Sequence, residues 1–348
     1  MLRKNKYIIF ILLLITVIAF CFDILLGSVS IPIGEALKIA TGSTKANPTW
    51  VTIITEFRIP KAITAILAGS ALSVCGLLMQ TFFRNPLADP YVLGISSGAS
   101  LGVALVILTT GTIGGKLFII GSIIGRISIT VAAGIGAAAV LFIITAFSKR
   151  ISSNVTLLIL GLMLGYIISS IESVLKYFSA PENLQGYIVW GMGNFGNVIW
   201  QDLVLLIPVV LVGLLSAFLL SKQLNLLLLG ESYASSMGAN IKLTRLLIII
   251  IAGILGGIIT AFCGPIAFIG IAVPHLTKSI FNKYDHLLLI PFVALVGSGL
   301  ALICDIISQL PGSDQVIPIN VVTSLVGAPV VIWIILQQKK IKHSSFME

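Results

Sequence analysis

The chain has 348 residues, of which 57% are hydrophobic and only 9% are charged, and its mean hydropathy is +1.13. Since soluble domains carry about a quarter charged residues, this composition excludes a soluble globular protein and indicates an integral membrane protein. The net charge of +9 comes from basic residues scattered singly or in pairs between apolar runs, which indicates membrane topology rather than nucleic-acid binding.

Apolar runs of the length needed to cross a bilayer, about 20 residues, predict ten membrane-spanning helices. The run near residues 265–281 contains Pro265, Gly270 and Pro274, so we expect it to be short or broken. The fold class is therefore predicted to be an all-α polytopic membrane protein with one transmembrane domain over residues 1–348. In chain order, the predicted spans are 7–26, 60–82, 91–110, 119–147, 154–177, 199–220, 243–262, 265–281, 287–308 and 318–337.

The distribution of basic residues predicts the orientation. With ten spans, fourteen lysines and arginines fall on the side of the N-terminus and seven on the opposite side. Cytoplasmic loops carry the excess of positive charge, so we expect both termini in the cytoplasm. Ten spans also divide into two sets of five, and an odd number of crossings inverts the second half relative to the first.

Small residues recur at helical spacing on several spans. Gly94, Gly98 and Gly102 lie four residues apart, as do Gly161 with Gly165 and Gly253 with Gly257. Such stripes let helix backbones approach closely in lipid, so they predict a tightly packed bundle and identify no ligand.

Residues that could carry chemistry are few. The chain has no Walker A sequence, so any ATP that drives transport must bind to another protein. The four cysteines and three histidines lack metal-ligand spacing. The charged residues in or near the spans lie toward the predicted outer ends, so they would either line an external vestibule or snorkel to the membrane interface. Glu172 and Lys176 are one helical turn apart, which predicts an ion pair between them. These charged residues are Arg126, Glu172, Lys176, Asp202 and Asp305.

Two segments between spans are unusual. Residues 84–90 read Arg-Asn-Pro-Leu-Ala-Asp-Pro, and so polar a segment must lie at a membrane surface or line a wet cavity. Residues 224–240 are moderately apolar and too short to cross the bilayer, and Gly230 and Gly238 bracket a predicted helix of about two turns. That helix would lie either on lipid or in a groove of a partner protein.

Five blocks of the sequence resemble the permease subunits of type II ABC importers for iron–siderophore complexes, haem and cobalamin, the FecCD-type permeases. The blocks span nearly the whole chain in order, and the second is the most specific. They are Arg58–Lys61 leading into Ala68–Leu72, Gln80–Gly94, Leu229–Gly238, Gly264–His275 and Pro318–Pro329.

The resemblance implies a role for each matching block. It places a cytoplasmic gate in the loop after the second span and in the turn before the fifth, at Asn85, Leu87, Ser152 and Ser153. It makes residues 230–238 the coupling helix that sits on the ATPase, with contacts at Gly230, Glu231, Ala234, Ser235, Met237 and Gly238. It also implies that Arg58 and Lys61 face outward and dock the substrate-binding protein. Relatives carry a further basic residue where this chain has Ser308–Leu310, so Lys38 or Lys45 could substitute here.

The resemblance further implies a homodimer in the bacterial inner membrane whose translocation path follows the two-fold axis. Two ATPase subunits, which hold ATP and magnesium, and a periplasmic or lipid-anchored binding protein would be its partners, besides membrane lipid. The chain itself is expected to bind no cofactor and no nucleic acid and to catalyse no reaction. The residues leave open which chelate or corrinoid is carried. They also leave open an alternative, an ion-coupled secondary transporter that works without an ATPase.

Overall fold

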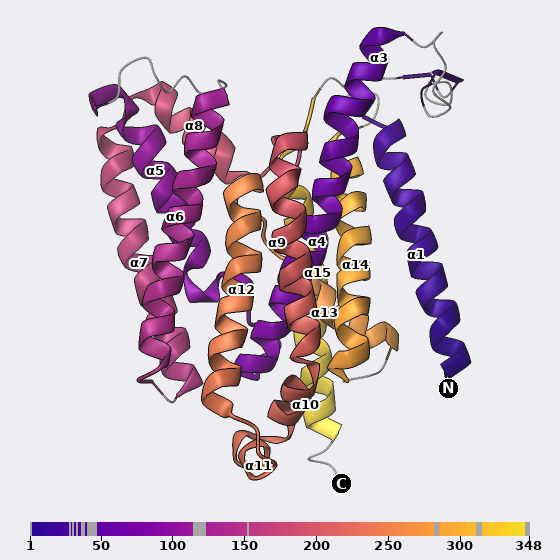
Figure 1. The fold of residues 1–348 in the computed structure, drawn as a ribbon, viewed down its shortest axis with the longest axis vertical. Coiled ribbons are helices and arrows are strands. Elements are labelled where there is room, and N and C mark those ends of the chain that lie inside the picture. Colours follow the sequence, from indigo (N-terminus) through magenta and orange to yellow (C-terminus); the bar gives the residue numbers. More distant parts are fainter. Residues whose placement is uncertain are drawn as a thin grey trace.

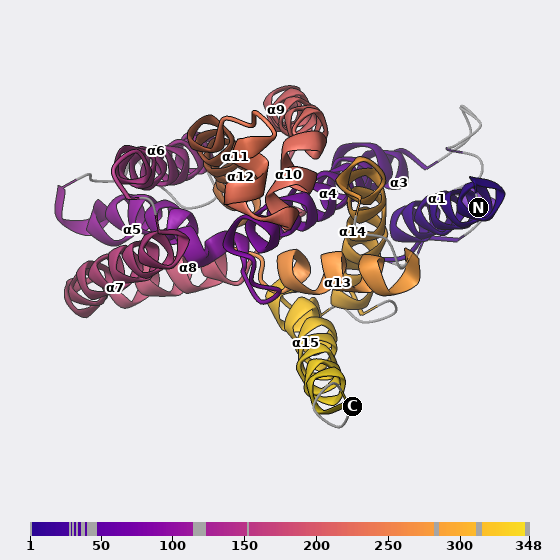
Figure 2. The same cartoon turned by 90° about the horizontal axis from the view of Figure 1, so that it is seen from below.

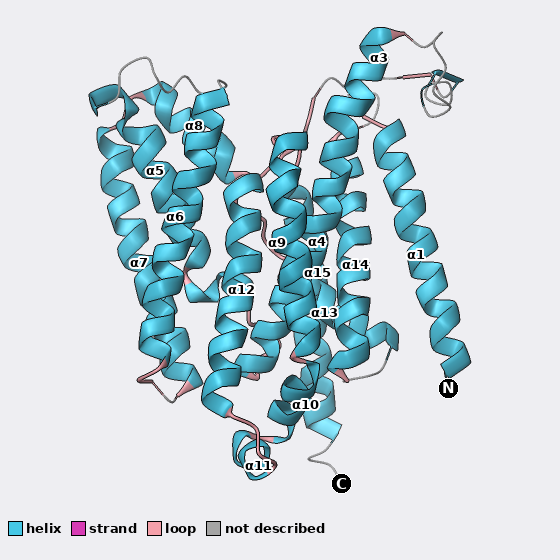
Figure 3. Cartoon of the chain, viewed as in Figure 1, coloured by secondary structure: helices cyan, strands magenta, loops and turns pink. Residues whose placement is uncertain are grey.

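A computed structural model describes residues 2–27, 29, 31–32, 34–35, 39, 47–113, 123–151, 153–281, 285–310 and 315–344. These residues form helices joined by loops, with no strand among them (Figure 3), so the all-α prediction is confirmed. Ten helices correspond in order to the ten predicted spans. They are α1 (Leu2–Leu25), α4 (Ile59–Phe83), α5 (Ile95–Ile113), α6 (Ile123–Ser148), α7 (Asn154–Phe178), α9 (Trp200–Leu219), α12 (Ile241–Cys263), α13 (Ile269–Phe281), α14 (His286–Ser308) and α15 (Ile319–Ser344).

Short helices fill the connections between the long ones. Before α4 lie α3 (Pro48–Thr52) and the π-helix η1 (Ile53–Arg58), and the 3₁₀-helix η2 (Pro90–Leu93) precedes α5. Helix α8 (Pro181–Gly191) follows α7, and α10 (Ser221–Leu229) and α11 (Glu231–Ser236) connect α9 to α12. The N-terminal end of α1 and the C-terminal end of α15 lie at the same end of the bundle as α11 (Figure 1).

Length and composition decide which helices can cross a bilayer. Among the described residues, seven helices are long and apolar enough to do so, and Ile95–Thr109 and Ile319–Trp333 are shorter apolar helices. Helix α13 has 13 residues. At 1.5 Å per residue it is about 20 Å long, less than the roughly 30 Å of a hydrocarbon core. The expectation of a short or broken eighth span is confirmed.

Helix α4 is the centre of the bundle. Nearly every residue from Pro60 to Phe82 is buried, including several serines and threonines whose hydroxyls bond to backbone carbonyls. Seen along the bundle, α4 lies in the middle, with α9 and α12 on one side and α13 and α14 on the other (Figure 2). Both ends of α4 are therefore placed where many elements meet.

Glycines set the closest helix contacts, as their spacing predicted. A methyl group on Gly98 would clash with the carbonyl of Gly136 on α6, and one on Gly136 would clash with the carbonyl of Gly98 on α5. Gly69 and Gly76 of α4 are equally close to the carbonyls of Gly297 on α14 and Gly270 on α13. Such backbone contact replaces the hydrophobic driving force that lipid cannot supply.

The two sets of five helices share one local feature. The third helix of each set, α5 and α13, begins directly after a residue of positive φ, Gly94 (φ 73°) and Phe268 (φ 69°) respectively. This correspondence supports related halves, and their inverted relation stays a prediction.

Candidate functional site

The polar segment after α4 satisfies its own backbone through tight turns. Arg84 adopts a left-handed conformation (φ 48°) and ends α4, its N–H bonding to the carbonyls of Gln80 and Thr81. The Asn85 carboxamide oxygen accepts from the Leu87 N–H at 3.0 Å. We name residues 84–94 the gate loop.

Asp89 continues the gate loop into η2. Its carboxylate accepts a hydrogen bond from the Tyr91 N–H at 2.9 Å and so caps that helix. Burial raises the pKa of this carboxyl to about 6, against a smaller lowering by the Tyr91 bond.

The gate loop is fastened to the segment that precedes α13. The Tyr91 hydroxyl donates to the Ile266 carbonyl and accepts from the Ile266 N–H, both at 2.8 Å. Asn320, at the start of α15, holds the same segment from the other side by bonds to Pro265 and Ala267. The extended backbone between α12 and α13 is thus paired within the protein, as irregular backbone at membrane depth must be.

The predicted gate residues lie near the ends of their helices, at the same end of the bundle as the coupling segment, and their side chains are accessible. Leu87 is 39% exposed, and Asn85 is half-buried. Ser153 is exposed and caps α7 by accepting from the Thr156 N–H at 3.2 Å. Ser152 lies outside the described residues. No hydrogen bond joins Ser153 to Asn85 or Leu87 in the described part, so the gate assignment stays a prediction.

Residues 230–238, which we name the coupling segment, have the predicted form. Helix α11 lies between Gly230 (φ 116°) and Gly238 (φ 84°), two backbone conformations that favour glycine. Ser235, Met237 and Gly238 are exposed and available to a partner.

One side chain of the coupling segment is oriented otherwise than expected. Ala234 is fully buried, because α11 packs this face against its own chain. The methyl group therefore anchors α11, and it is not available to fit a groove on a partner.

Glu231 is half-buried and bonds to other helices of its own chain. Its carboxylate receives two bonds from the Arg245 guanidinium of α12, at 2.7 and 2.8 Å. The Asn154 amide of α7 donates to the same carboxylate at 3.3 Å and to the Phe82 carbonyl at 2.9 Å. One residue of the coupling segment is thereby connected to α12, to the start of α7 and to the end of α4.

Two further contacts join α10 to the C-terminal end of α4. The Arg84 guanidinium donates to the Leu227 carbonyl at 2.9 Å. His286, at the start of α14, bonds through one ring nitrogen to Thr81 at 2.8 Å and through the other to the Asn225 amide oxygen at 2.7 Å. Each contact links α10, which precedes the coupling segment, to α4, which is followed by the gate loop.

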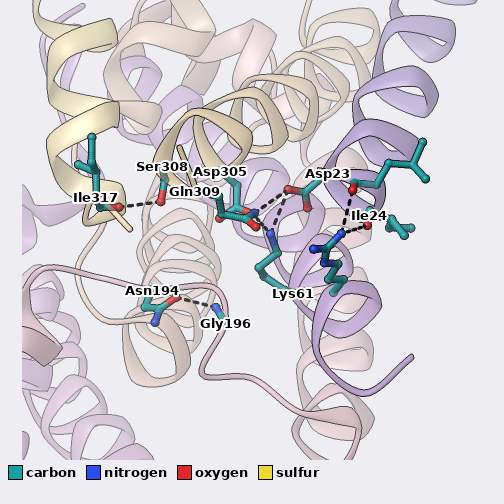
Figure 4. Close-up of polar contacts among 11 residues, drawn as sticks. Asp23, Ile24, Lys61, Asn194, Gly196, Asp305, Ser308, Gln309 and Ile317 are labelled. Carbon is teal, nitrogen blue, oxygen red and sulfur yellow. Dashed lines mark hydrogen bonds and ion pairs between the residues drawn. The ribbon is translucent and has the colours of Figure 1, made fainter. Parts of the chain in front are cut away.

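At the opposite end of α4, Arg58 is buried and Lys61 points toward Asp23 and Asp305 (Figure 4). The Arg58 guanidinium donates to the carbonyls of Ile24, Leu25 and Val29, and the residue is only 5% exposed. The expectation that Arg58 faces outward is therefore wrong, because its donors terminate α1, whose last carbonyls have no partner within the helix.

Lys61 lies between two buried carboxylates. Its ammonium is 3.1 Å from Asp23 and 2.5 Å from Asp305, and the Gln309 amide bonds to both acids (Figure 4). Lys61 does not face outward either, since turning it out would leave two acids without their cation. Gln309 lies in the segment Ser308–Leu310, where relatives were expected to carry a basic residue, and here its amide bonds to both acids.

The charged residues expected at an external vestibule form local pairs. Arg126 lies 2.8 Å from Asp202, beside a cavity of about 250 Å³ between α6, α8, α9 and α12. Glu172 and Lys176 form the predicted ion pair at 3.5 Å.

No sequence pattern identified several residues that the structure places in the site. Asp23 sits alone near the end of an apolar run, and Asn154, Asn225 and His286 belong to no motif. A buried carboxylate in a span or an amide at a helix start is a weak signal by itself. Only the fold shows that their partners come from distant parts of the chain.

A bundle of membrane-length apolar helices, whose central helix α4 ends in a polar loop bonded to α10, is typical of a membrane transport protein. The chain belongs to the FecCD transport family, whose sequence pattern matches residues 14–337.

Individual relatives are similar over most of their length. The vitamin B12 import system permease protein BtuC of Klebsiella pneumoniae subsp. pneumoniae is 36% identical over 338 residues, which are 97% of this chain and 96% of that protein. The hemin transport system permease protein HmuU of Yersinia pestis is 35% identical over 303 residues, 86% of this chain and 87% of the other.

A solved structure agrees with the fold. An inward-facing conformation of a putative metal-chelate type ABC transporter superposes with a TM-score of 0.82 at 28% identity. The superposition covers 95% of this chain and 99% of the other. The chain is thus a multi-span transport permease of the inner membrane.

Proposed function

We propose that this chain is the translocation subunit of an ATP-driven importer and works as a homodimer around a central path. Its similarity to import permeases for vitamin B12 and haemin, and to an ABC transporter of the metal-chelate type, supports this function. The proposed cargo is a large metal chelate, namely cobalamin, haem or an iron–siderophore complex, delivered by a substrate-binding protein.

The observation that carries the proposal is the bonding that connects the coupling segment and the neighbouring helix α10 to the end of α4, where the gate loop begins. Glu231, Asn154 and Phe82 form one continuous set of contacts, and Arg84 joins α10 beside it. An external force on α11 therefore acts directly on the end of α4. A chain that generated its own driving force would not need such a connection at its surface.

The driving force for import is proposed to come from a separate pair of ATPase subunits, which bind ATP and magnesium. They would contact the exposed Ser235, Met237 and Gly238. The excess of basic residues on the same side supports a cytoplasmic position for α11 and for both termini.

The gate is proposed to lie where the gate loop meets the turn before α7. Asn85 and Leu87 from one side, with Ser152 and Ser153 from the other, would narrow the path in each protomer. Small hydroxyls suit a constriction that must open for a bulky chelate.

Docking of the binding protein at Arg58 and Lys61 stays a prediction. Their buried position supports an indirect role, in which they hold the outer ends of α1, α4 and α14 together beneath the docking surface.

Reconstitution tests the function. The permease, its ATPase and the cargo-loaded binding protein are placed in proteoliposomes, and import of each chelate is measured with ATP. We expect ATP-dependent import only with all three proteins. Import by the lone permease under an ion gradient would contradict the proposal and favour a secondary transporter.

A further inference from the structure

A basic groove opens at the cytoplasmic end of the bundle, between the end of α6 and the start of α12. Its volume is about 340 Å³, and none of its lining residues is acidic. The lining residues are Ser148, Lys149, Ile151, Asn240, Lys242, Leu243, Arg245 and Leu246.

Two of the three cations in the groove are available to a ligand. Lys149 and Lys242 are exposed, and neither has an ion-pair partner among the described residues. The charge of Arg245 is largely neutralised by Glu231. The positive end of the α12 dipole lies at the same place, since Asn240 caps that helix. The groove therefore selects an anion.

The surface that continues from the groove is apolar. Leu243, which lines the groove, is 50% exposed. Further exposed apolar side chains follow one face of α6 at intervals of four and seven residues, as expected for a helix face in contact with lipid. They are Ile127, Val131, Ile135 and Phe142.

We propose that this groove binds the headgroup of an anionic phospholipid of the cytoplasmic leaflet, with the phosphate between Lys149 and Lys242. The acyl chains would lie along the exposed apolar face of α6. A partner protein with an acidic segment would satisfy the lysines but not the apolar surface that leads away from them into the bilayer. The combination of cations at the helix ends with exposed hydrophobic side chains favours a lipid.

The test is lipid titration of the purified full-length chain, followed by native mass spectrometry. Phosphatidylglycerol and phosphatidylcholine with the same acyl chains are compared on the wild type and on the Lys149→Gln/Lys242→Gln variant. Because a cation near an anionic headgroup strengthens binding about five-fold, the double variant should bind phosphatidylglycerol about 25-fold more weakly. Its affinity for phosphatidylcholine should not change. Both lysines are exposed, so the variant should fold normally.

Lys222→Gln is the matched control, because Lys222 is exposed on α10 at the same end of the molecule. It should bind phosphatidylglycerol as the wild type does. An equal loss in this control, or no loss in the double variant, would overturn the proposal.

Two further outcomes identify other occupants. If sodium phosphate at millimolar concentration displaces the lipid, the groove is a site for a soluble anion and the lipid assignment is wrong. If the double variant loses co-elution with the ATPase while lipid binding is unchanged, the groove is a protein contact. Neither result bears on whether the chain transports chelates, since lipid binding is measured without import.

Discussion

Asn154→Ala should weaken the connection between ATP hydrolysis and import. The Asn154 amide, at the start of α7, donates to the Phe82 carbonyl at 2.9 Å and to the Glu231 carboxylate at 3.3 Å. One side chain thus joins three elements: the start of α7, the end of α4 and the coupling segment. Alanine keeps the helical backbone of α7 and removes both bonds.

The expected magnitude follows from the two bonds. A neutral hydrogen bond, such as the one to the Phe82 carbonyl, contributes about 1 kcal/mol. A bond to a charged group contributes about 1.5–3 kcal/mol, and the bond to Glu231 is expected at the low end because it is long. Together they supply about 2.5 kcal/mol of coupling. The bond from Arg84 to Leu227 and the contacts of His286 with Thr81 and Asn225 remain. We therefore expect import to fall by about ten-fold, or about 1.4 kcal/mol, and not to zero.

The assay measures import and ATP hydrolysis on the same proteoliposomes. Hydrolysis should be unchanged, so the amount of chelate imported per ATP falls. Asn47→Ala is the control, because Asn47 is an exposed helix cap at the opposite end of the molecule and should alter neither rate. A parallel fall in both rates would mean that Asn154 serves assembly with the ATPase. Unchanged import would refute the argument that this bridge transmits the motion.

Three other substitutions test the remaining sites. Lys61→Ala leaves two buried acids without their cation and should destabilise the chain by about 3–5 kcal/mol. Thermal unfolding in detergent should show a lower midpoint, and Asp23→Asn should partly restore it. An unchanged midpoint would contradict this reasoning. Gly136→Leu forces a side chain against the backbone of α5 and should lower the free energy of unfolding by about 1–3 kcal/mol. The variant should lose its monodisperse peak in size-exclusion chromatography, and normal elution and stability would contradict the close packing. Ser153→Trp should slow import while ATPase subunits still co-elute, and wild-type import would argue against the gate.

The sequence predicted the helices well, because each span is an apolar run ended by polar residues. The prediction 60–82 became Ile59–Phe83, and 287–308 became His286–Ser308. The short eighth span followed from its prolines and glycines, and the helix between Gly230 and Gly238 followed from its bracketing residues. In each case the cause is local, so a single sequence contains it.

The orientation of the charged side chains could not be predicted in the same way. The family resemblance implied that Arg58 and Lys61 are exposed docking residues. Their partners are carbonyls and carboxylates of α1 and α14, and Asp305 lies more than 240 positions away from Lys61 in the chain. Pairing at such separation depends on how the helices pack, which no local pattern specifies.

The contacts of α4 determine what kind of motion the bundle can make. At its outer end Lys61 ties α4 to α1 and α14, and along its length Gly69 and Gly76 bring its backbone against α14 and α13. Helices α5 and α6 are fastened to each other by an equally close contact at Gly98. Close-packed groups of this kind move as units and do not deform continuously. The gate loop joins α4 to α5 and so connects the two groups. Displacement of α11 by a partner should therefore tilt one group against the other about the gate loop, so that the path opens there while α4 itself stays straight.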